Sequence, residues 1–233
     1  MNYPHKEKSC IIFDLADTLI SLYPKPEEII HDYFRDNYSK NINKLKIREA
    51  LIFLSNIFHY SSINIKTIKQ RETFYLNYNK NLLNNLGLIH LATPENIFEL
   101  FKKEKPTWNF KEGTKELLNN LKNNKYKIGL ISNFNGKEAL KILSKNNSNE
   151  LFDFIHISEN EGLEKPNTEF YSNFLSKNSL DKDSCLYIGD SYTLDYIPSK
   201  LIDLPFVLLD EINIFKHIKN RVSNLSEISQ MLF

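Results

Sequence analysis

Short apolar runs separated by stretches of helical spacing constrain this sequence more than any other feature. Five apolar runs are bounded by polar or turn-forming residues, at 10–13, 127–131, 154–157, 185–188 and 206–209. Between the later runs, apolar residues recur at three- and four-residue intervals in segments 114–123, 136–144, 168–176 and 195–201. This alternation predicts right-handed βαβ units, and so an α/β core with a doubly wound, Rossmann-like parallel sheet covered by helices on both faces.

The long segment between the first and second apolar runs has a helical pattern throughout. Its helices are expected at 27–35, 47–58, 65–86 and 94–103. Thr93-Pro94-Glu95 is a good helix start, because threonine caps a helix and proline suits its first position. Prolines at 24, 26 and 106 interrupt helix and favour extended linkers. The sequence therefore predicts a core of residues 1–22 and 107–233, with an inserted all-helical domain at 23–106.

The overall composition is that of an ordinary globular protein. Of the 233 residues, 41% are hydrophobic and 25% charged, which disfavours disordered, collagen-like and fibrous classes. The formal net charge is +1, and acidic residues offset the many lysines along the same stretches. We therefore interpret the lysines as solvated surface and expect no nucleic-acid partner. The sequence gives no basis for assigning an oligomeric state.

The cellular compartment is predicted from the cysteines and the apolar stretches. Cys10 and Cys185 each begin an apolar run, which is typical of buried strands rather than a disulfide framework. The first nine residues are polar, with no following apolar stretch of signal-peptide length, and no run is long enough to span a membrane. We expect a cytoplasmic protein without membrane attachment.

Polar residues follow the predicted strands directly. Asp14 follows the first run, Ser132 and Asn133 follow the second, and Gly189-Asp190 follows the fourth. Ligands of doubly wound sheets bind beyond the carboxyl ends of the strands, so these residues are candidates for one site. Taken singly, each residue also fits a purely structural role, at the end of a strand, as a helix cap or in a turn.

Four sequence pieces, in this order, resemble the motifs of the haloacid dehalogenase-like superfamily. They are residues 11–19, residues 128–133, Glu164-Lys165-Pro166, and residues 187–191 with Asp195. The helical insertion after the first piece is similar to the cap of one subfamily, so the resemblance covers nearly the whole chain. It implies a Mg²⁺-dependent phosphohydrolase that acts on a small phosphorylated metabolite.

The chemistry of phosphoryl transfer gives a role to each residue type. Asp14 can ligate Mg²⁺ with one oxygen and attack phosphorus with the other, forming an aspartyl-phosphate. Charge spreads over the phosphoryl oxygens during transfer; Lys165 can neutralise it and Ser132 can donate a hydrogen bond to it, with Thr18 and the amide of Asn133 as further donors.

The metal ligands are expected at the ends of the first and fourth runs. Asp190 would be the second metal carboxylate beside Asp14, and Asp195 either supports it or serves as an alternate ligand. The resemblance adds a backbone carbonyl two residues after the nucleophile, which here belongs to Ala16.

Ala16 is also where the sequence departs from the family pattern. Phosphatases of the family usually carry a second aspartate there, which protonates the leaving group and then activates water. General acid–base catalysis contributes about 10²–10⁴-fold, so its loss is expected to slow the hydrolysis of ordinary alkyl phosphates by that amount. Asp17, where the family usually has glycine, is a candidate replacement for the missing acid.

Two other functions remain open. A protein that binds a phosphorylated ligand or a protein partner without efficient turnover would also account for Ala16. Phosphonate-cleaving members of the superfamily have alanine there too, but they need a cap lysine, and nothing distinguishes Lys66, Lys69 or Lys80 for that role. Members that cleave carbon–halogen bonds lack the metal-binding Gly-Asp pair, so Gly189-Asp190 favours phosphate.

Overall fold

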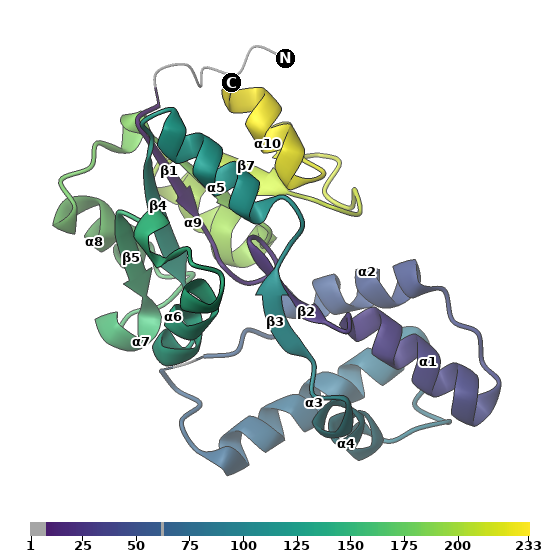
Figure 1. The fold of residues 1–233 in the computed structure, drawn as a ribbon. Coiled ribbons are helices and arrows are strands. Elements are labelled where there is room, and N and C mark those ends of the chain that lie inside the picture. The colour runs from purple at the N-terminus through teal and green to yellow at the C-terminus, as the bar shows by residue number, and fades with distance from the viewer. Residues whose placement is uncertain (1–7, 62) are drawn as a thin grey trace. The chain divides into compact units, whose positions relative to one another are not determined.

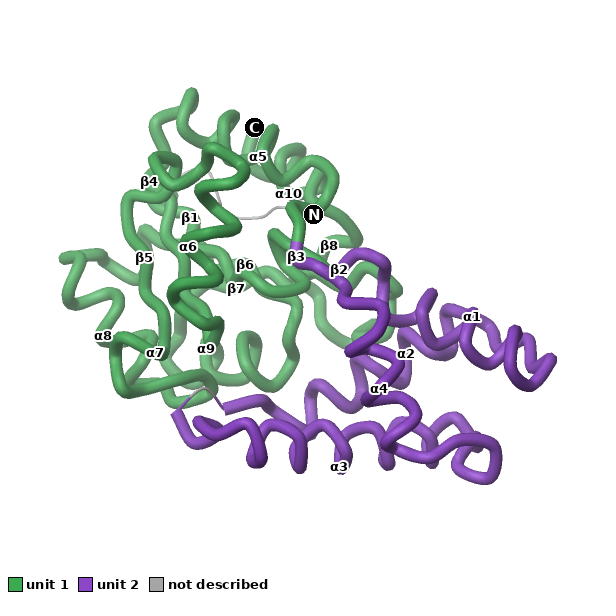
Figure 2. The backbone as a smooth tube through the Cα atoms, turned by 60° about the horizontal axis from the view of Figure 1, so that its bottom comes forward, with its two compact units in different colours: residues 1–21, 109–233 green, residues 22–108 purple. Residues whose placement is uncertain are grey.

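The computed structural model describes residues 8–61 and 63–233, which divide into two compact units. The first unit combines residues up to Ser21 with Asn109–Phe233, and the second is Leu22–Trp108 (Figure 2). Most of the polar N-terminal segment, on which the expected lack of a signal peptide rests, lies outside the described residues.

A six-stranded parallel sheet forms the centre of the first unit (Figure 1). Its strands are β1 (Cys10–Phe13), β4 (Lys127–Ser132), β5 (Phe154–Ile157), β6 (Cys185–Gly189), β7 (Phe206–Leu209) and β8 (Arg221–Val222). Their spatial order is β5-β4-β1-β6-β7-β8, with every neighbouring pair parallel. The chain steps outward from β1 to β5 and then restarts at β6 on the other side of β1. This confirms the predicted doubly wound α/β fold and adds β8, which is too short to produce a pattern.

Three helices of the first unit fall close to their predicted positions, and two were not predicted. The predicted ones are α5 (Thr114–Asn123), α6 (Gly136–Lys145) and α8 (Thr168–Lys177), and the others are α7 (Ser158–Glu161) and α10 (Leu225–Leu232). A further helix, α9 (Ile197–Leu201), covers part of a predicted segment. Phe170, Tyr171 and Phe174 of α8 pack with Cys10 and Tyr187 on one face of the sheet. Helix α5 packs against β4 and α10. The segment predicted as a helix at 195–201 is instead the end of a π-helical turn, η3 (Tyr192–Tyr196), followed by α9.

The second unit contains four helices among its described residues. They are α1 (Pro26–Tyr38), α2 (Lys44–Ser55), α3 (Ile68–Leu86) and α4 (Pro94–Glu104). A buried cluster that includes Phe34, Ile47, Leu83 and Ile97 joins all four. Thr93 caps α4 as expected, because its side chain accepts a hydrogen bond from the Asn96 N–H.

Two short strands were not predicted. They are β2 (Ile20–Tyr23) and β3 (Thr107–Phe110), and they form a two-stranded sheet where the chain passes from one unit to the other. Each has only four residues and lies next to a proline, so neither shows a strand period of its own. The two strands thus interrupt the helical pattern expected throughout the segment between the first two apolar runs, at the borders of the predicted helical domain of residues 23–106.

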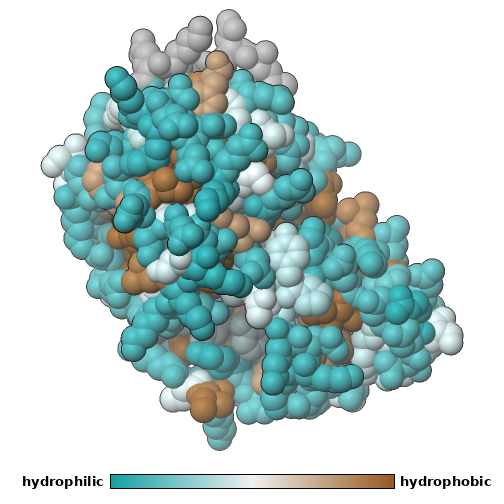
Figure 3. Space-filling model, in the orientation of Figure 1, coloured by the Kyte–Doolittle hydropathy of each residue, from teal (hydrophilic) through white to brown (hydrophobic). Residues whose placement is uncertain are grey.

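The two cysteines and the surface agree with the composition. Cys10 and Cys185 lie opposite each other in β1 and β6, buried and unoxidised, as expected for strand residues. Figure 3 shows a face on which hydrophilic side chains predominate and apolar ones form small separate groups. Within the described residues, no helix is long and apolar enough to cross a membrane.

Candidate active site

The candidate residues gather at the carboxyl ends of three adjacent strands. Asp14 follows β1, and its backbone N–H extends the sheet by donating to the Ile188 carbonyl of β6 at 2.9 Å. Ser132 is the last residue of β4, and Asp190 follows β6 directly. Because β4, β1 and β6 are neighbours and parallel, these ends share one edge of the sheet.

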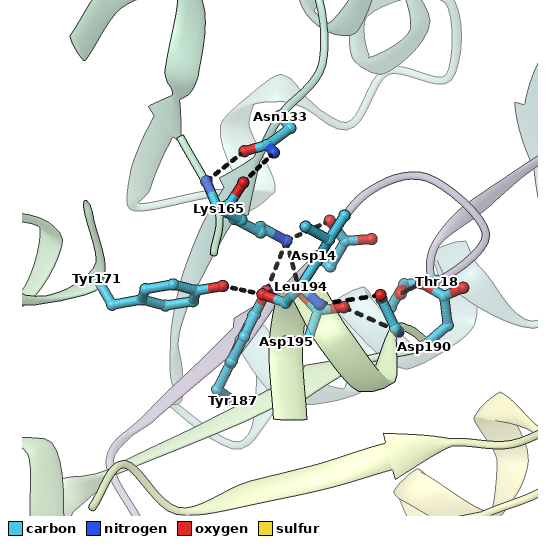
Figure 4. Close-up of polar contacts among 10 residues, drawn as sticks. Asp14, Thr18, Asn133, Lys165, Tyr171, Tyr187, Asp190, Leu194 and Asp195 are labelled. Atoms are coloured by element: carbon cyan, nitrogen blue, oxygen red, sulfur yellow. Dashed lines mark hydrogen bonds and ion pairs between the residues drawn. The ribbon is translucent and has the colours of Figure 1, made fainter. Parts of the chain in front are cut away.

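Lys165 brings a positive charge to the acidic residues at this edge of the sheet (Figure 4). Its Nζ lies 2.6 Å from Asp14 Oδ1 and 2.7 Å from Asp195 Oδ1. The lysine is only 3% exposed, and both carboxylates are also buried. A buried ammonium is tolerated only with such partners. Lys165 therefore forms ion pairs with Asp14 and Asp195 at the same time and links the two side chains.

Asn133 fixes the backbone of Lys165. Its side-chain amide donates to the Lys165 carbonyl at 2.9 Å, and its Oδ1 accepts from the Lys165 N–H at 2.8 Å. This pair of hydrogen bonds attaches the loop that carries Lys165 to the end of β4. The sequence predicted that the amide of Asn133 donates a hydrogen bond to the phosphoryl oxygens. The structure adds a second role, in which its side chain positions Lys165.

Asp190 lies among other acidic groups. Its Oδ1 accepts a hydrogen bond from the Thr18 hydroxyl at 3.2 Å. The neighbouring Asp17 has a left-handed backbone with φ of 58°, and its carbonyl accepts from Lys111 Nζ at 2.9 Å. Lys111 also forms an ion pair with Glu211. Thr18 thus links this turn to the end of β6, and Lys111 links it to Glu211 in the loop after β7.

Asp195 folds back onto the strand end from η3. Its Oδ2 accepts from the Ser191 N–H at 3.0 Å, while its Oδ1 contacts Lys165 and the Tyr187 hydroxyl. A Cβ atom at Gly189 would lie 2.5 Å from Asp195 Oδ2, so only glycine leaves room for this arrangement. Asp195 therefore has donors on both oxygens, which suits a supporting residue better than a freely available ligand.

The electrostatics indicate an excess of negative charge. Burial raises the pKa of Asp14 to about 6, because the attraction of Lys165 does not fully offset burial and the charge of Asp195. Burial, followed by the charges of Asp17 and Asp14, raises the pKa of Asp190 well above its usual value. Burial works to lower the pKa of Lys165, but Asp14 and Asp195 outweigh it and raise that pKa.

The donor set fits a hard divalent cation. Carboxylate oxygens of Asp14, Asp190 and Asp195 lie within 4.8 Å of one another. Mg²⁺ prefers oxygen ligands, is usually held by one or two carboxylates, and retains several waters. A bound cation would also offset the charge that raises the pKa values of Asp14 and Asp190.

The remaining predicted residues lie on the same edge or beside it. Ser132 is buried at the end of β4, and Ala16 is partly exposed in the turn after β1, where it bridges to Ile20. The structure thus joins Asp14, Lys165 and Asp195 through direct contacts and Thr18 with Asp190 through another.

Three residues of this network were missed by the sequence reasoning: Tyr187, Lys111 and Glu211. Tyr187 offered a weak signal, because a buried tyrosine hydroxyl in an apolar strand needs a polar partner. Lys111 and Glu211 are an ordinary lysine and glutamate in loops, and only folding brings them together.

Comparison with known proteins decides the family. A family model described as haloacid dehalogenase-like hydrolase matches residues 11–209. The chain belongs to this family. Mouse haloacid dehalogenase-like hydrolase domain-containing protein 3 is 29% identical over 98 residues, a match that covers 42% of this chain and 39% of the mouse protein. The chain thus matches less than half the length of this curated relative.

Solved structures of haloacid dehalogenase-like hydrolases share the fold. The putative hydrolase YfnB from Bacillus subtilis, solved with bound magnesium, superposes with a TM-score of 0.63 and 20% identity, covering 97% of this chain and 98% of YfnB. A predicted phosphoglycolate phosphatase from Haemophilus somnus gives a TM-score of 0.64 at 15% identity, covering 97% and 99%. At these identities the likeness shows the fold alone, so the specific chemistry is argued from the site residues.

Proposed function

We propose that this haloacid dehalogenase-like hydrolase is a Mg²⁺-dependent phosphohydrolase that acts on a small phosphorylated metabolite through an aspartyl-phosphate on Asp14. One observation carries the proposal: the buried Lys165 ammonium contacts Asp14 within an acidic cluster that also contains Asp190. Acidic residues alone would bind only a metal cation. A metal cation on one side of Asp14 and the Lys165 ammonium on the other would together provide the positive charge that a phosphate dianion needs.

The residues divide the work of binding. Mg²⁺, held by Asp14, Asp190 and the Ala16 carbonyl, would supply positive charge against the phosphoryl oxygens. Lys165 would neutralise the same oxygens from the other side, with the hydroxyls of Ser132 and Thr18 and the Asn133 N–H as donors. Asp195 would keep Lys165 and the metal ligands in place.

The first chemical step is an attack by the free oxygen of Asp14 on phosphorus. A phosphorus–oxygen bond to Asp14 forms while the ester bond breaks, and the leaving oxygen departs with the electron pair. In the second step water attacks the phosphorylated Asp14, releasing inorganic phosphate and restoring the carboxylate. Each step involves a proton: the leaving group needs one, and the attacking water must lose one.

Ala16 can perform neither proton transfer. Asp17 is the candidate to replace it, because its charge is among the causes that raise the pKa of Asp190 and it therefore lies close to the acidic cluster. Where neither transfer is efficient, substrates with acidic leaving groups are favoured, since they depart without protonation. The helical unit would serve as the cap that selects the substrate, as in the resembling subfamily, in a cytoplasmic enzyme.

The test is phosphate release from p-nitrophenyl phosphate with Mg²⁺. Turnover should disappear with a chelator and return with Mg²⁺, and Asp14→Asn should abolish it. Asp203→Asn is the matched control, because Asp203 is exposed and belongs to the same unit. Unchanged turnover in Asp14→Asn would overturn the proposal.

A second candidate function is phosphate-ligand binding without efficient turnover, and Ala16 is the observation that favours it. Ala16→Asp separates the two. A gain of 10²-fold or more in hydrolysis of an alkyl phosphate, about the value of a general acid, would show a site that lacks only this group and would favour binding. Little gain, together with loss of turnover in Asp17→Ala, would support a working catalyst that uses Asp17.

A further inference from the structure

The Tyr187 hydroxyl occupies the centre of the Lys165 network. It lies 2.7 Å from Lys165 Nζ and donates to Asp195 Oδ1 at 2.6 Å. Lys165 Nζ lies 2.7 Å from the same Asp195 oxygen, so the three polar atoms form a closed triangle. Figure 4 shows Tyr187 rising from its strand into this triangle, with Asp14 on the far side of the ammonium.

Tyr187 is held in place by the core around it. Lys165 Nζ lies 5.4 Å from the ring centroid but only 2.7 Å from the hydroxyl oxygen, so the hydroxyl and not the ring face contacts the ammonium. The side chain is fully buried on β6, where its ring also packs edge-on against Tyr171 at 5.7 Å. A tyrosine held this firmly offers the ammonium one fixed oxygen instead of a mobile one.

The chemistry of this acceptor matters because the surroundings are already acidic. Asp14, Asp190 and Asp195 together raise the electrostatic cost of any further negative charge. The phenol oxygen accepts a hydrogen bond from the ammonium without adding negative charge. Its own proton is donated to Asp195, which then has one acceptor position filled by a neutral group. Lys165 is therefore less strongly drawn to Asp195 and stays in contact with Asp14.

We infer that Tyr187 is a positioning residue, whose hydroxyl holds the Lys165 ammonium between Asp195 and Asp14. The inference rests on the proposed function for its catalytic consequence, but its geometric part stands independently. Without the hydroxyl, Lys165 shifts toward Asp195 and neutralises less of the charge that develops beside Asp14 during phosphoryl transfer.

The test compares Tyr187→Phe with Tyr78→Phe. Both variants remove one tyrosine hydroxyl that is hydrogen-bonded inside the protein, but the Tyr78 hydroxyl donates to the Leu51 carbonyl in the helical unit. Tyr187→Phe should lower kcat for p-nitrophenyl phosphate by about 10–100-fold at saturating Mg²⁺, the usual effect of removing a partner of a site group. Tyr78→Phe should change kcat by no more than about threefold, because the Tyr78 hydroxyl is bonded to Leu51 instead. Urea unfolding checks that both variants remain folded.

A second measurement does not depend on turnover. The ¹⁵N-detected ammonium signal of Lys165, assigned by its loss in Lys165→Arg, should shift and exchange faster with water in Tyr187→Phe but not in Tyr78→Phe. An unchanged signal in Tyr187→Phe, or equal loss of kcat in both variants, would overturn the inference. If the wild-type protein shows no turnover, the proposed function fails, and the ammonium signal alone then decides the role of Tyr187.

Discussion

At the scale of single residues, the site depends on one lysine balancing several acids. Lys165 is the partner of both Asp14 and Asp195, and all three side chains are buried. Buried ion pairs contribute little net stability compared with apolar residues, but removing one member leaves an unpaired buried charge. The fold therefore tolerates these acids only while their counter-charge is present.

Lys165→Met should lower the free energy of unfolding by about 3–5 kcal/mol in the absence of metal, the usual cost of breaking a buried ion pair. Urea denaturation followed by circular dichroism measures this. Lys177→Met is the control, because the Lys177 side chain is mostly exposed and its ion pair with Glu161 should contribute little stability. A similar loss in both variants would contradict the account of Lys165.

At the scale of elements, the connection from β6 to η3 brings Asp195 back to the strand end. This requires Gly189, because a Cβ atom there would lie 2.6 Å from Asp195 Cγ and 2.8 Å from Asp195 Cβ. The contact is with the core of the side chain rather than its flexible end, so Asp195 would have to move.

Gly189→Ala should destabilise the protein by about 1–3 kcal/mol, the usual cost of overpacking, and should abolish most Mg²⁺-dependent turnover. Gly136→Ala is the matched control. Its added Cβ would lie 3.3 Å from the flexible carboxylate of Glu159, which can move aside. Retention of full activity in Gly189→Ala would show that the position of Asp195 does not matter.

Asp153 is the second element-scale feature, since it joins α5 to the start of β4. Its carboxylate accepts from Lys122 Nζ at 2.9 Å and from the Ile128 N–H at 2.8 Å. Burial works to raise the pKa of Asp153, but these hydrogen bonds and one from Lys127 outweigh it and lower that pKa. The folded protein thus stabilises the ionised form.

This lowered pKa predicts how stability depends on pH. The contribution of Asp153 should be fully present above its ordinary pKa of 3.8 and should be lost as pH falls through the lower folded-state value. Asp153→Asn should therefore cost about 1.5–3 kcal/mol near neutral pH and progressively less under acid conditions. Urea unfolding of both proteins across this pH range checks the prediction, and a constant difference at every pH would contradict it.

At the scale of the whole molecule, the sequence predicted the features that follow from apolar periodicity and from the positions where strands end. The sheet and the edge that carries Asp14, Ser132 and Asp190 followed from apolar runs and from the rule that parallel strands end together. Contacts between loops did not follow, because Lys111 and Glu211 are far apart in sequence. The strands β2 and β3 were missed because a segment of four residues beside a proline is too short to show an alternating pattern. Tyr187 was missed because it lies within an apolar run, where its hydroxyl does not stand out.

The proposed reaction requires that Asp14 becomes phosphorylated. Departure of p-nitrophenol needs no general acid, whereas hydrolysis of the aspartyl-phosphate needs an activated water that Ala16 cannot provide. The phosphorylated protein should therefore accumulate to the extent that Asp17 does not activate this water, and rapid quenching detects it before hydrolysis in either case. The most direct measurement is rapid acid quenching after mixing with ³²P-labelled p-nitrophenyl phosphate and Mg²⁺. Protein-bound label should appear in the wild type and be absent from Asp14→Asn, whereas equal labelling of both proteins would rule out Asp14 as the nucleophile.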